Sequence, residues 1–376
     1  MDDLRKRTWA EISLKNLRSN YEAIRARLPE GCRFLGVVKA DAYGHGAVQV
    51  AHLLQDAGAD YLAVAELDEA MELRSSGVYI PILILGHTPA EFTETLVRND
   101  ITQAVTCLAK AEEYSREASR LGLTLRVHIK LDTGMSRMGF LCAGAHFDEG
   151  VDNVIRSCSL PGLESEGVFT HFAVSDEPGE ENERYTREQF ALFLRVIEAV
   201  ETRSGIHFAI RHCANSGAVL HDPEMLLDMV RPGLLLYGYG DDGALGLRPC
   251  MRLVTRITTI KHYEAGTAVS YGRHFVTDRM TRMAVLGIGY ADGLPRLCSN
   301  RCRFAVADGF APQRGNICMD MCMADVSAIP AAAVDSEVEI FGERNRIEPL
   351  CEAAQTIPYE LLCAVSKRVP RVYTVK

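Results

Sequence analysis

From about residue 30 to residue 240, the chain alternates between two hydrophobic patterns. Short runs of apolar, often β-branched residues are typical of buried strands, and apolar residues at three- and four-residue intervals are typical of amphipathic helices. The strand-like runs cover residues 34–38, 61–64, 80–85, 103–106, 125–131, 166–172, 210–213 and 227–230. The helical patterns between them include residues 48–57, 68–75, 109–121 and 188–201. Eight such alternations predict an α/β fold of the (β/α)8 barrel type.

After residue 240 the pattern changes. Strand-like alternation continues at residues 251–263, 283–288, 303–307 and 337–341, whereas helical periodicity remains only at residues 347–355 and 359–367. This change predicts a second, mainly-β domain. We therefore predict a barrel over residues 1–240 and a mainly-β domain over residues 241–376, with the first ten residues or so as a candidate for pairing with the β domain.

Composition narrows the function. The 376 residues carry a net charge of -9 with a pI near 5.7, and no stretch supplies the clustered basic surface that a nucleic-acid-binding protein needs. The longest apolar runs, such as residues 79–86, fall well short of the ~20 residues of a spanning helix, and the charged start of the chain is unlike a secretory signal. We expect a cytoplasmic protein with a small-molecule partner, without nucleic acid or membrane.

The cysteines need separate consideration. Twelve are spread through the chain without the density of a disulfide framework, which favours reduced thiols. Cys298, Cys302, Cys318 and Cys322 form two Cys-x3-Cys pairs that suggest zinc ligands. Structural zinc sites usually use tighter Cys-x2-Cys spacing, and the flanking residues are strand-like. We expect no metal.

Polar residues follow several of the predicted barrel strands. In a (β/α)8 barrel, functional groups stand at the C-terminal ends of the strands, so such residues converge on one mouth. A single strand-end lysine is usually a solvated charge, and a single histidine is usually a satisfied, partly buried residue. Several at one level predict a site. These residues are Lys39, His87, Lys130, Asp132, His171, Asn215, Ser216 and Arg231.

Lys39 lies in the string VVKADAYGHG, residues 37–46. An apolar strand here delivers a lysine to a pocket, and burial lowers an ammonium pKa as imine chemistry requires. Taken alone, the string is equally compatible with a lysine that caps a strand in water.

The same string is similar to the cofactor-attachment signature of alanine racemases. The similarity continues in order over almost the whole chain, which makes it specific. It includes DTGMSRMG at 132–139, THF at 170–172, HCANS at 212–216, VRPG at 230–233, VSYG at 269–272, GYADG at 289–293, CMD at 318–320 and RVPRVY at 368–373.

The resemblance implies a pyridoxal-phosphate-dependent enzyme that interconverts L- and D-alanine, which in bacteria supplies D-alanine for cell-wall peptidoglycan. It implies the same two domains, and a head-to-tail homodimer in which each active site combines barrel residues of one chain with C-terminal residues of the other. Lys39 would bind the cofactor and serve as the base on the D face, and Tyr271 of the partner subunit would be the base on the L face. His171 would connect that tyrosine to Arg231 at the pyridine nitrogen. Because arginine does not release its proton, the ring nitrogen would stay unprotonated.

Further roles follow from the resemblance. Arg137, with the backbone of the partner subunit's Met319, would bind the substrate carboxylate. Lys130 matches a lysine that is carbamylated in many members of the family. Cofactor binding would involve Lys39, Tyr43, Asn215, Ser216, Arg231, Gly233, Leu234 and Tyr359.

Three alternatives remain at this point. A racemase that prefers serine or another small amino acid is the nearest, as in membrane-tethered relatives with an added membrane domain. A decarboxylase with the same two domains is disfavoured by the match around Tyr271. From a different class, a non-catalytic pyridoxal-phosphate carrier uses a similar barrel and lysine but consists of the barrel alone, so the predicted β domain argues against it.

Overall fold

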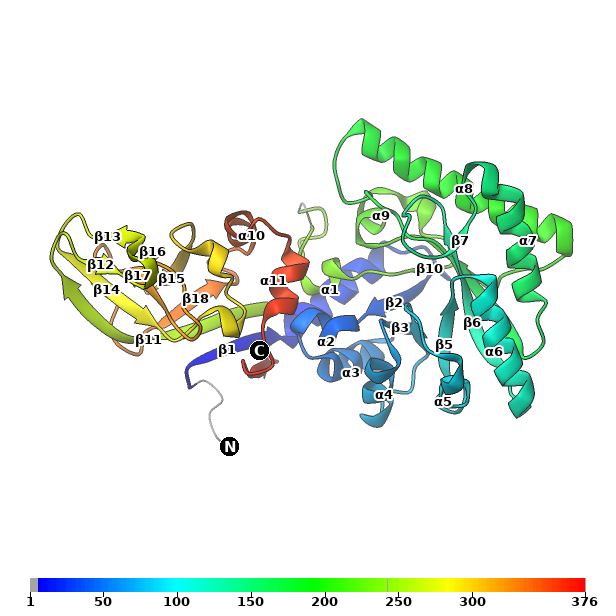
Figure 1. Ribbon diagram of the computed structural model, residues 1–376, viewed down its shortest axis with the longest axis horizontal. Coiled ribbons are helices and arrows are strands. Elements are labelled where there is room, and N and C mark those ends of the chain that lie inside the picture. The colour runs from blue at the N-terminus through cyan, green and yellow to red at the C-terminus, as the bar shows by residue number, and fades with distance from the viewer. Residues whose placement is uncertain (1–5, 242, 376) are drawn as a thin grey trace.

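The computed structural model describes residues 6–241 and 243–375. The protein has two lobes, a parallel barrel surrounded by helices and an elongated β domain, with the first strand and the last helix between them (Figure 1). The predicted combination of a (β/α)8 barrel and a mainly-β domain is confirmed. Residues 1–5, part of the segment considered for pairing with the β domain, lie outside the described residues.

All neighbouring strands of the barrel run parallel, in the order β10-β2-β3-β4-β5-β6-β8-β9. The ring closes between β9 and β10, where the Asp228 amide donates to the Arg211 carbonyl at 3.1 Å and the Arg231 amide to the Ala214 carbonyl at 2.9 Å. The strands are β2 (Arg33–Val37), β3 (Tyr61–Val64), β4 (Ile82–Ile84), β5 (Ile101–Val105), β6 (Leu125–Asp132), β8 (Leu163–Phe169), β9 (Ile210–His212) and β10 (Met229–Val230).

Helices follow most of these strands and cover the outside of the barrel (Figure 1). Four of these helices, α3, α4, α6 and α8, match the predicted helical patterns. Helix α8 begins at residue 180 rather than 188, because its first two turns are too polar to show the periodicity. The helices are α1 (Leu14–Arg27), α2 (Lys39–Gly44), α3 (Ala47–Ala57), α4 (Leu67–Ser75), α5 (Thr93–Arg98), α6 (Leu108–Leu121), α7 (Phe147–Cys158), α8 (Glu180–Ser204) and α9 (Ser216–His221).

The β domain is organised around one long strand, β11 (Met251–Tyr263). Its first part pairs with β1 (Thr8–Ser13) and β18 (Glu337–Phe341), and after a bulge between Ile257 and Thr259 its second part pairs with β14 (Thr281–Leu286). β1 also pairs with β19 (Arg371–Thr374), so the two ends of the chain join the same sheet. The other elements are β12 (Ala268–Val269), β13 (Phe275–Val276), β15 (Arg303–Val306), β16 (Gly309–Arg314), β17 (Cys322–Asp325), α10 (Glu348–Ala354) and α11 (Pro358–Ala364).

Among the described residues, no helix combines the length and apolarity needed to cross a membrane.

Candidate active site

Lys39 follows β2 directly and begins an unusual turn. Four consecutive residues, Ala40 to Tyr43, have left-handed backbone angles with φ between 51° and 53°. For residues other than glycine, this conformation is about 1 kcal/mol or more per residue higher in energy than the right-handed one, so the surrounding structure must hold the turn in place. The turn places Lys39 at one end and Tyr43 at the other, and both side chains line the same cavity.

Two buried or half-buried side chains hold this turn. The Glu69 carboxylate accepts hydrogen bonds from the Ala40 amide at 2.5 Å and the Ala65 amide at 2.7 Å, which ties the ends of β2 and β3 together. Arg371 donates to the Gly44 carbonyl at 2.9 Å and also to the Val365 carbonyl after α11. Sequence analysis assigned neither residue a role, although Arg371 lies within one of the matching motifs.

The cavity at the C-terminal ends of the barrel strands has a volume of about 510 Å³. It brings together most of the predicted site. The predicted residues that line it are Lys39, Tyr43, Lys130, Arg137, His171, Asn215, Ser216, Arg231, Gly233 and Tyr359. Ile357, Asp176 and Phe169 also line it, and sequence analysis did not identify them.

Five predicted residues lie elsewhere. Asp132 is buried at the end of β6 and is not among the described residues that line the cavity. Leu234 is buried next to Gly233, and His87 is exposed; neither is among the described residues that line the cavity. Tyr271 and Met319 are on the β domain, where their side chains are 74% and 53% exposed. β12 and β13, which flank Tyr271, lie at the end of the β domain farthest from the barrel (Figure 1). A single chain therefore does not bring Tyr271 into its own cavity.

One side of the cavity fits a phosphate group. The Ser216 hydroxyl accepts hydrogen bonds from the amides of Gly233 at 3.0 Å and Leu235 at 3.4 Å. A β-carbon at Gly233 would lie 2.7 Å from the Tyr43 hydroxyl, so only glycine leaves this space open. The Tyr43 ring in turn packs edge-on against Tyr359, with 5.6 Å between centroids. Hydroxyl and amide donors thus surround a space that a side chain would fill, as phosphate binding requires.

Asn215 has a structural contact within this group. Its side-chain oxygen accepts from the Ala218 amide at 3.3 Å as the N-cap of α9, and from the Ser175 hydroxyl at 2.6 Å. These bonds fix the start of α9 and with it the position of Ser216.

The cavity is positively charged. Burial, and then the charge of Arg137, lower the pKa of Lys39, while Glu69 acts in the opposite direction. Burial and the charge of Arg231 lower the pKa of Lys130 to about 7. Lys130 is 3% exposed, and its ammonium donates only to the Leu131 carbonyl, at 3.0 Å, among the bonds of the described residues. Such a site favours an anionic ligand, or a modification that removes the charge of Lys130.

Arg231 is 4% exposed and, within the described part of the chain, hydrogen-bonds to no carboxylate. It donates to the carbonyls of Thr170 at 2.7 Å and Cys213 at 3.1 Å and contacts ring nitrogens of His171 at 3.4 Å and His212 at 3.0 Å. Burial lowers its pKa to about 10, which still leaves a cation at neutral pH. Burial also lowers the pKa of His171 well below 6.5, so this imidazole is neutral.

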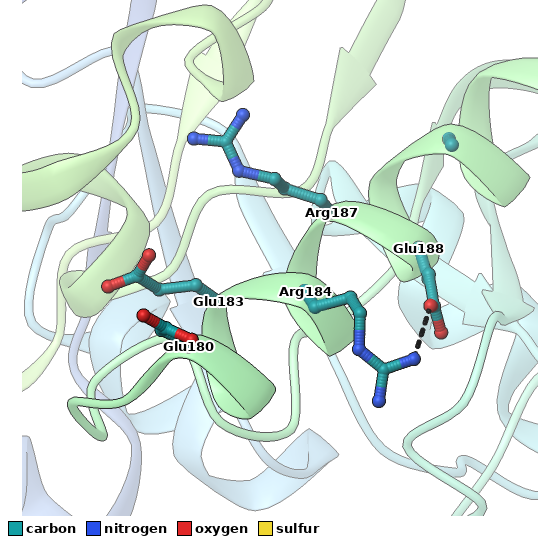
Figure 2. A pocket seen from close by; sticks show the side chains of 6 residues that line it. Glu180, Glu183, Arg184, Arg187 and Glu188 are labelled. Atoms are coloured by element: carbon teal, nitrogen blue, oxygen red, sulfur yellow. Dashed lines mark hydrogen bonds and ion pairs between the residues drawn. The ribbon is translucent and has the colours of Figure 1, made fainter.

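A second hollow lies on the outer face of α8, and Figure 2 shows its lining. Glu180, Glu183 and Arg187 project from the helix, and Arg184 forms an ion pair with Glu188 at 3.1 Å. All of these side chains come from one exposed helix face, which is the usual surface of a solvated helix. In the residues that the structure describes, no group of three or more His, Cys, Asp or Glu side chains is arranged to hold a metal ion.

The barrel, its lysine and its phosphate-sized cradle, together with an added β domain, define a class: pyridoxal-phosphate enzymes of the barrel fold. The family follows from comparison with known proteins. A family model described as the N-terminal domain of alanine racemase matches residues 12–241, and one described as the C-terminal domain matches residues 250–373. The chain belongs to the alanine racemase family.

Individual relatives agree. Alanine racemase of Desulfovibrio desulfuricans is 44% identical over 97% of both chains, and that of Clostridium perfringens is 42% identical over 99% of this chain and 97% of its own. A solved alanine racemase structure from Clostridium difficile superposes with a TM-score of 0.92 at 40% identity, covering 99% of this chain and 97% of that one. A Bacillus anthracis structure with bound L-Ala-P superposes with a TM-score of 0.89 at 30% identity, covering 98% and 95%.

The recognition from sequence is thus confirmed. The protein is an alanine racemase that interconverts L- and D-alanine, and it is a pyridoxal-phosphate-dependent enzyme like the rest of its family. The serine-specific, decarboxylase and carrier alternatives are not favoured, because the relatives matched over nearly the whole chain are alanine racemases.

Proposed function

We propose that the racemase works as a head-to-tail homodimer in which each active site is shared. The barrel of one subunit supplies the cofactor site, and the β domain of its partner supplies Tyr271 and Met319. The domain boundary belongs to the same proposal: the barrel extends to about residue 240, and the β domain follows. The observation that carries the proposal is the 74% exposure of Tyr271, outside its own cavity, in a chain whose barrel otherwise assembles the predicted site.

The surface around Tyr271 is suited to such a contact. The Asn316 side chain donates to the Tyr271 carbonyl at 2.7 Å, and the Ser270 hydroxyl donates to the Asn316 carbonyl at 2.6 Å, so the Tyr271 turn is fixed to the segment that leads to Met319. The Ala291 amide donates to the Met319 carbonyl at 3.0 Å. Tyr271, Met319 and the neighbouring Met321, which is 46% exposed, thus present exposed apolar groups on hydrogen-bonded segments, as is common at interfaces.

In this proposal Lys39 holds the cofactor covalently and, when released, moves the proton on the D face, while the partner subunit's Tyr271 moves the proton on the L face. When bound, pyridoxal phosphate accepts the electrons left by the α-proton. His171 assists the tyrosine. Because arginine always donates, the His171 nitrogen facing Arg231 accepts, and the other ring nitrogen carries the hydrogen that can be donated to the Tyr271 oxygen. A donor at this oxygen favours the phenolate that a tyrosine base requires.

The remaining contacts follow from the cavity. Tyr43, Ser216, Gly233 and Tyr359 would hold the phosphate, with the Leu234 amide beside them and Asn215 setting the start of α9. Arg231 would face the ring nitrogen. Arg137, exposed at the mouth of the cavity, would bind the alanine carboxylate together with the backbone of the partner subunit's Met319.

We propose that Lys130 is carbamylated. A neutral amine combines with CO2 to give a carbamate anion and release one proton, and the lowered pKa of Lys130 supplies the neutral amine. The resulting anion would orient the nearby Arg137. Protein incubated with 13C-labelled bicarbonate should show one carbamate carbonyl signal that is absent in Lys130→Ala and retained in Lys110→Ala. A signal that survives Lys130→Ala would contradict the assignment.

We propose that the enzyme acts in the cytoplasm and supplies D-alanine for peptidoglycan. All twelve cysteines are free thiols, as is usual in a reducing compartment. Bacteria that require external D-alanine should grow without it when they carry the wild-type chain and fail to grow when they carry Lys39→Ala. Growth only when the enzyme is exported would oppose a cytoplasmic role.

Mixing two inactive variants tests the shared site. In a dimer of one Lys39→Ala chain and one Tyr271→Phe chain, a shared arrangement places both substitutions in one site and leaves the other site native. Random exchange gives one half hybrid dimers with one working site each, so activity should recover to about a quarter of wild type.

Sites contained within single chains would give no recovery, because every site would then carry one substitution. Mixing two differently tagged preparations of Lys39→Ala alone is the matched control and should stay inactive. Sedimentation of the mixed sample at assay concentration measures the fraction of dimer directly.

A further inference from the structure

A chain of hydrogen bonds crosses the inside of the barrel beneath the cavity. Arg231 donates to His212 Nδ1 at 3.0 Å, His212 Nε2 lies 2.9 Å from His128 Nδ1, and His128 Nε2 lies 3.2 Å from Glu166 Oε2. The Tyr61 hydroxyl donates to Glu166 Oε1 at 3.0 Å. These residues come from β3, β6, β8, β9 and the end of β10, and both histidines are fully buried.

The donor and the acceptor of each hydrogen bond in this chain follow from Arg231, at which the chain begins. A guanidinium has hydrogens on all of its nitrogens and cannot accept, so His212 Nδ1 is the acceptor. The single hydrogen of neutral His212 is then on Nε2 and is donated to His128 Nδ1. His128 therefore carries its hydrogen on Nε2 and donates to Glu166. A second proton on either ring would put two N–H groups face to face, so both imidazoles are neutral.

The electrostatics agree with this order. Burial lowers the pKa of both histidines, and the charges of Arg231 and, at His212, Lys130 add to the effect. Burial would raise the pKa of Glu166, but the hydrogen bonds from His128 and Tyr61, helped by the Arg126 charge, leave it below its ordinary value. The chain thus begins with a cation and ends with an anion, separated by two polarised neutral rings.

Packing fixes the two rings. The Phe169 ring stacks on His212 with 4.8 Å between centroids and 12° between planes. His128 lies against β8 where the strand has no side chain: a β-carbon at Gly167 would lie 2.7 Å from the His128 ring. Neither imidazole can turn over without disturbing this contact, so the hydrogen-bond direction is built into the barrel core.

We propose that Glu166 is a positioning residue for racemisation: through His128 and His212 it balances the charge of Arg231 and fixes the plane of its guanidinium in the wall of the cavity. Arg231 makes no direct contact with a carboxylate of the described chain, so Glu166 balances its charge indirectly, through the two histidines. The proposal rests on the role proposed above for Arg231. It adds that the carboxylate of Glu166 on β8, which is not among the described residues lining the cavity, tunes Arg231, which does line it.

Histidine NMR on the holoenzyme tests the chain independently of activity. With 15N-labelled histidine, His128 and His212, assigned from His128→Gln and His212→Gln, should both show a protonated Nε2 and an unprotonated Nδ1, unchanged from pH 5.5 to 8.5. Titration of either ring in this range, or a hydrogen on Nδ1 of either, would overturn the proposal.

Kinetics test the consequence. Glu166→Gln keeps the shape and an acceptor for His128 but removes the charge. We expect kcat in both directions to fall about tenfold, KM for alanine to change less than about threefold, and the visible absorption band of the bound cofactor to shift. Glu164→Gln, an exposed glutamate on the same strand, is the matched control and should leave all three unchanged.

Two outcomes separate the possible failures. If Glu166→Gln lowers thermal stability while kcat and the absorption band stay at wild-type values, the chain is only structural and the proposal is wrong. In an Arg231→Lys background, Glu166→Gln should have less than about a twofold further effect, since it acts through the arginine. If Arg231→Lys itself leaves kcat unchanged, the role proposed for Arg231 fails, whatever the NMR shows.

Discussion

The barrel and the β domain each depart from the usual placement of side chains, in which charged groups are exposed and apolar groups are buried. Within the barrel, the cations Lys130 and Arg231 are 3% and 4% exposed, without a carboxylate in contact among the described residues. On the β domain, Tyr271 and Met319 are 74% and 53% exposed. Buried charge and exposed apolar surface are both unfavourable in an isolated chain, which agrees with the proposed anionic ligand in the barrel and the proposed second subunit at the β domain.

The largest effect should come from substituting the proposed catalytic side chain of each region. Lys39→Ala and Tyr271→Phe should each lower racemisation by about 10³-fold or more, since each would remove a proposed proton-transfer group. Their effects on the cofactor should differ. Lys39→Ala would remove the proposed covalent attachment and should release pyridoxal phosphate on dialysis, whereas Tyr271→Phe should retain it with affinity within about threefold of wild type.

Absorbance of the dialysed protein, followed by a D-alanine assay, measures both quantities. Lys110→Ala and Tyr79→Phe, at surface positions of the barrel, are the matched controls and should behave as wild type. If Tyr271→Phe lost the cofactor as completely as Lys39→Ala, the division of labour between the two regions would be wrong.

The fold was largely predictable from the sequence for a physical reason. Parallel barrel strands are covered on both sides and therefore appear as short continuous apolar runs, and all eight such runs correspond to strands. Pairs such as β12 and β13, two residues each, carry too few positions for any period to show. β16 was missed because Gly309 and Pro312 interrupt its alternation. α7 shows the regular apolar spacing that is typical of an amphipathic helix.

The site residues also divide into those that the sequence predicts and those that only the structure identifies. Motif resemblance identified ten of the residues that line the cavity, most of which follow the barrel strands. The buried chain was missed, although one signal was present: His128 lies two residues before Lys130 on one strand and so points to the same face. Glu166 gave no such signal, since a carboxylate in a short strand usually faces solvent. Only the three-dimensional structure shows that it meets His128 of the neighbouring strand β6.

A smaller expected effect is a dependence of folding stability on pH that differs between the barrel and the β domain. Four barrel histidines, His45, His128, His171 and His212, have lowered pKa values because of burial, and that of His45 falls to about 4. The unfolded chain takes up protons on these residues below about pH 6.5, whereas the folded chain does not. Stability is therefore lost as the pH falls below this value, by about 1 kcal/mol at pH 5.5 for His45.

The barrel should therefore lose amide protection between pH 7 and pH 5.5 more than the β domain, as measured by hydrogen exchange corrected for its intrinsic pH dependence. Trp9, the single tryptophan, lies in β1, so its fluorescence in parallel urea titrations reports on the unfolding of the β sheet.

His45 offers the sharpest variant, since its Nδ1 donates to the Ala42 and Tyr43 carbonyls while its Nε2 is buried without a partner in the described structure. His45→Asn should flatten the acid dependence by about 1 kcal/mol at pH 5.5, whereas His262→Asn, at an exposed position of β11, should not. An unchanged slope in His45→Asn would mean that the folded barrel admits the proton, and the contrast between a sealed barrel interior and an open β-domain surface would then fail at this residue.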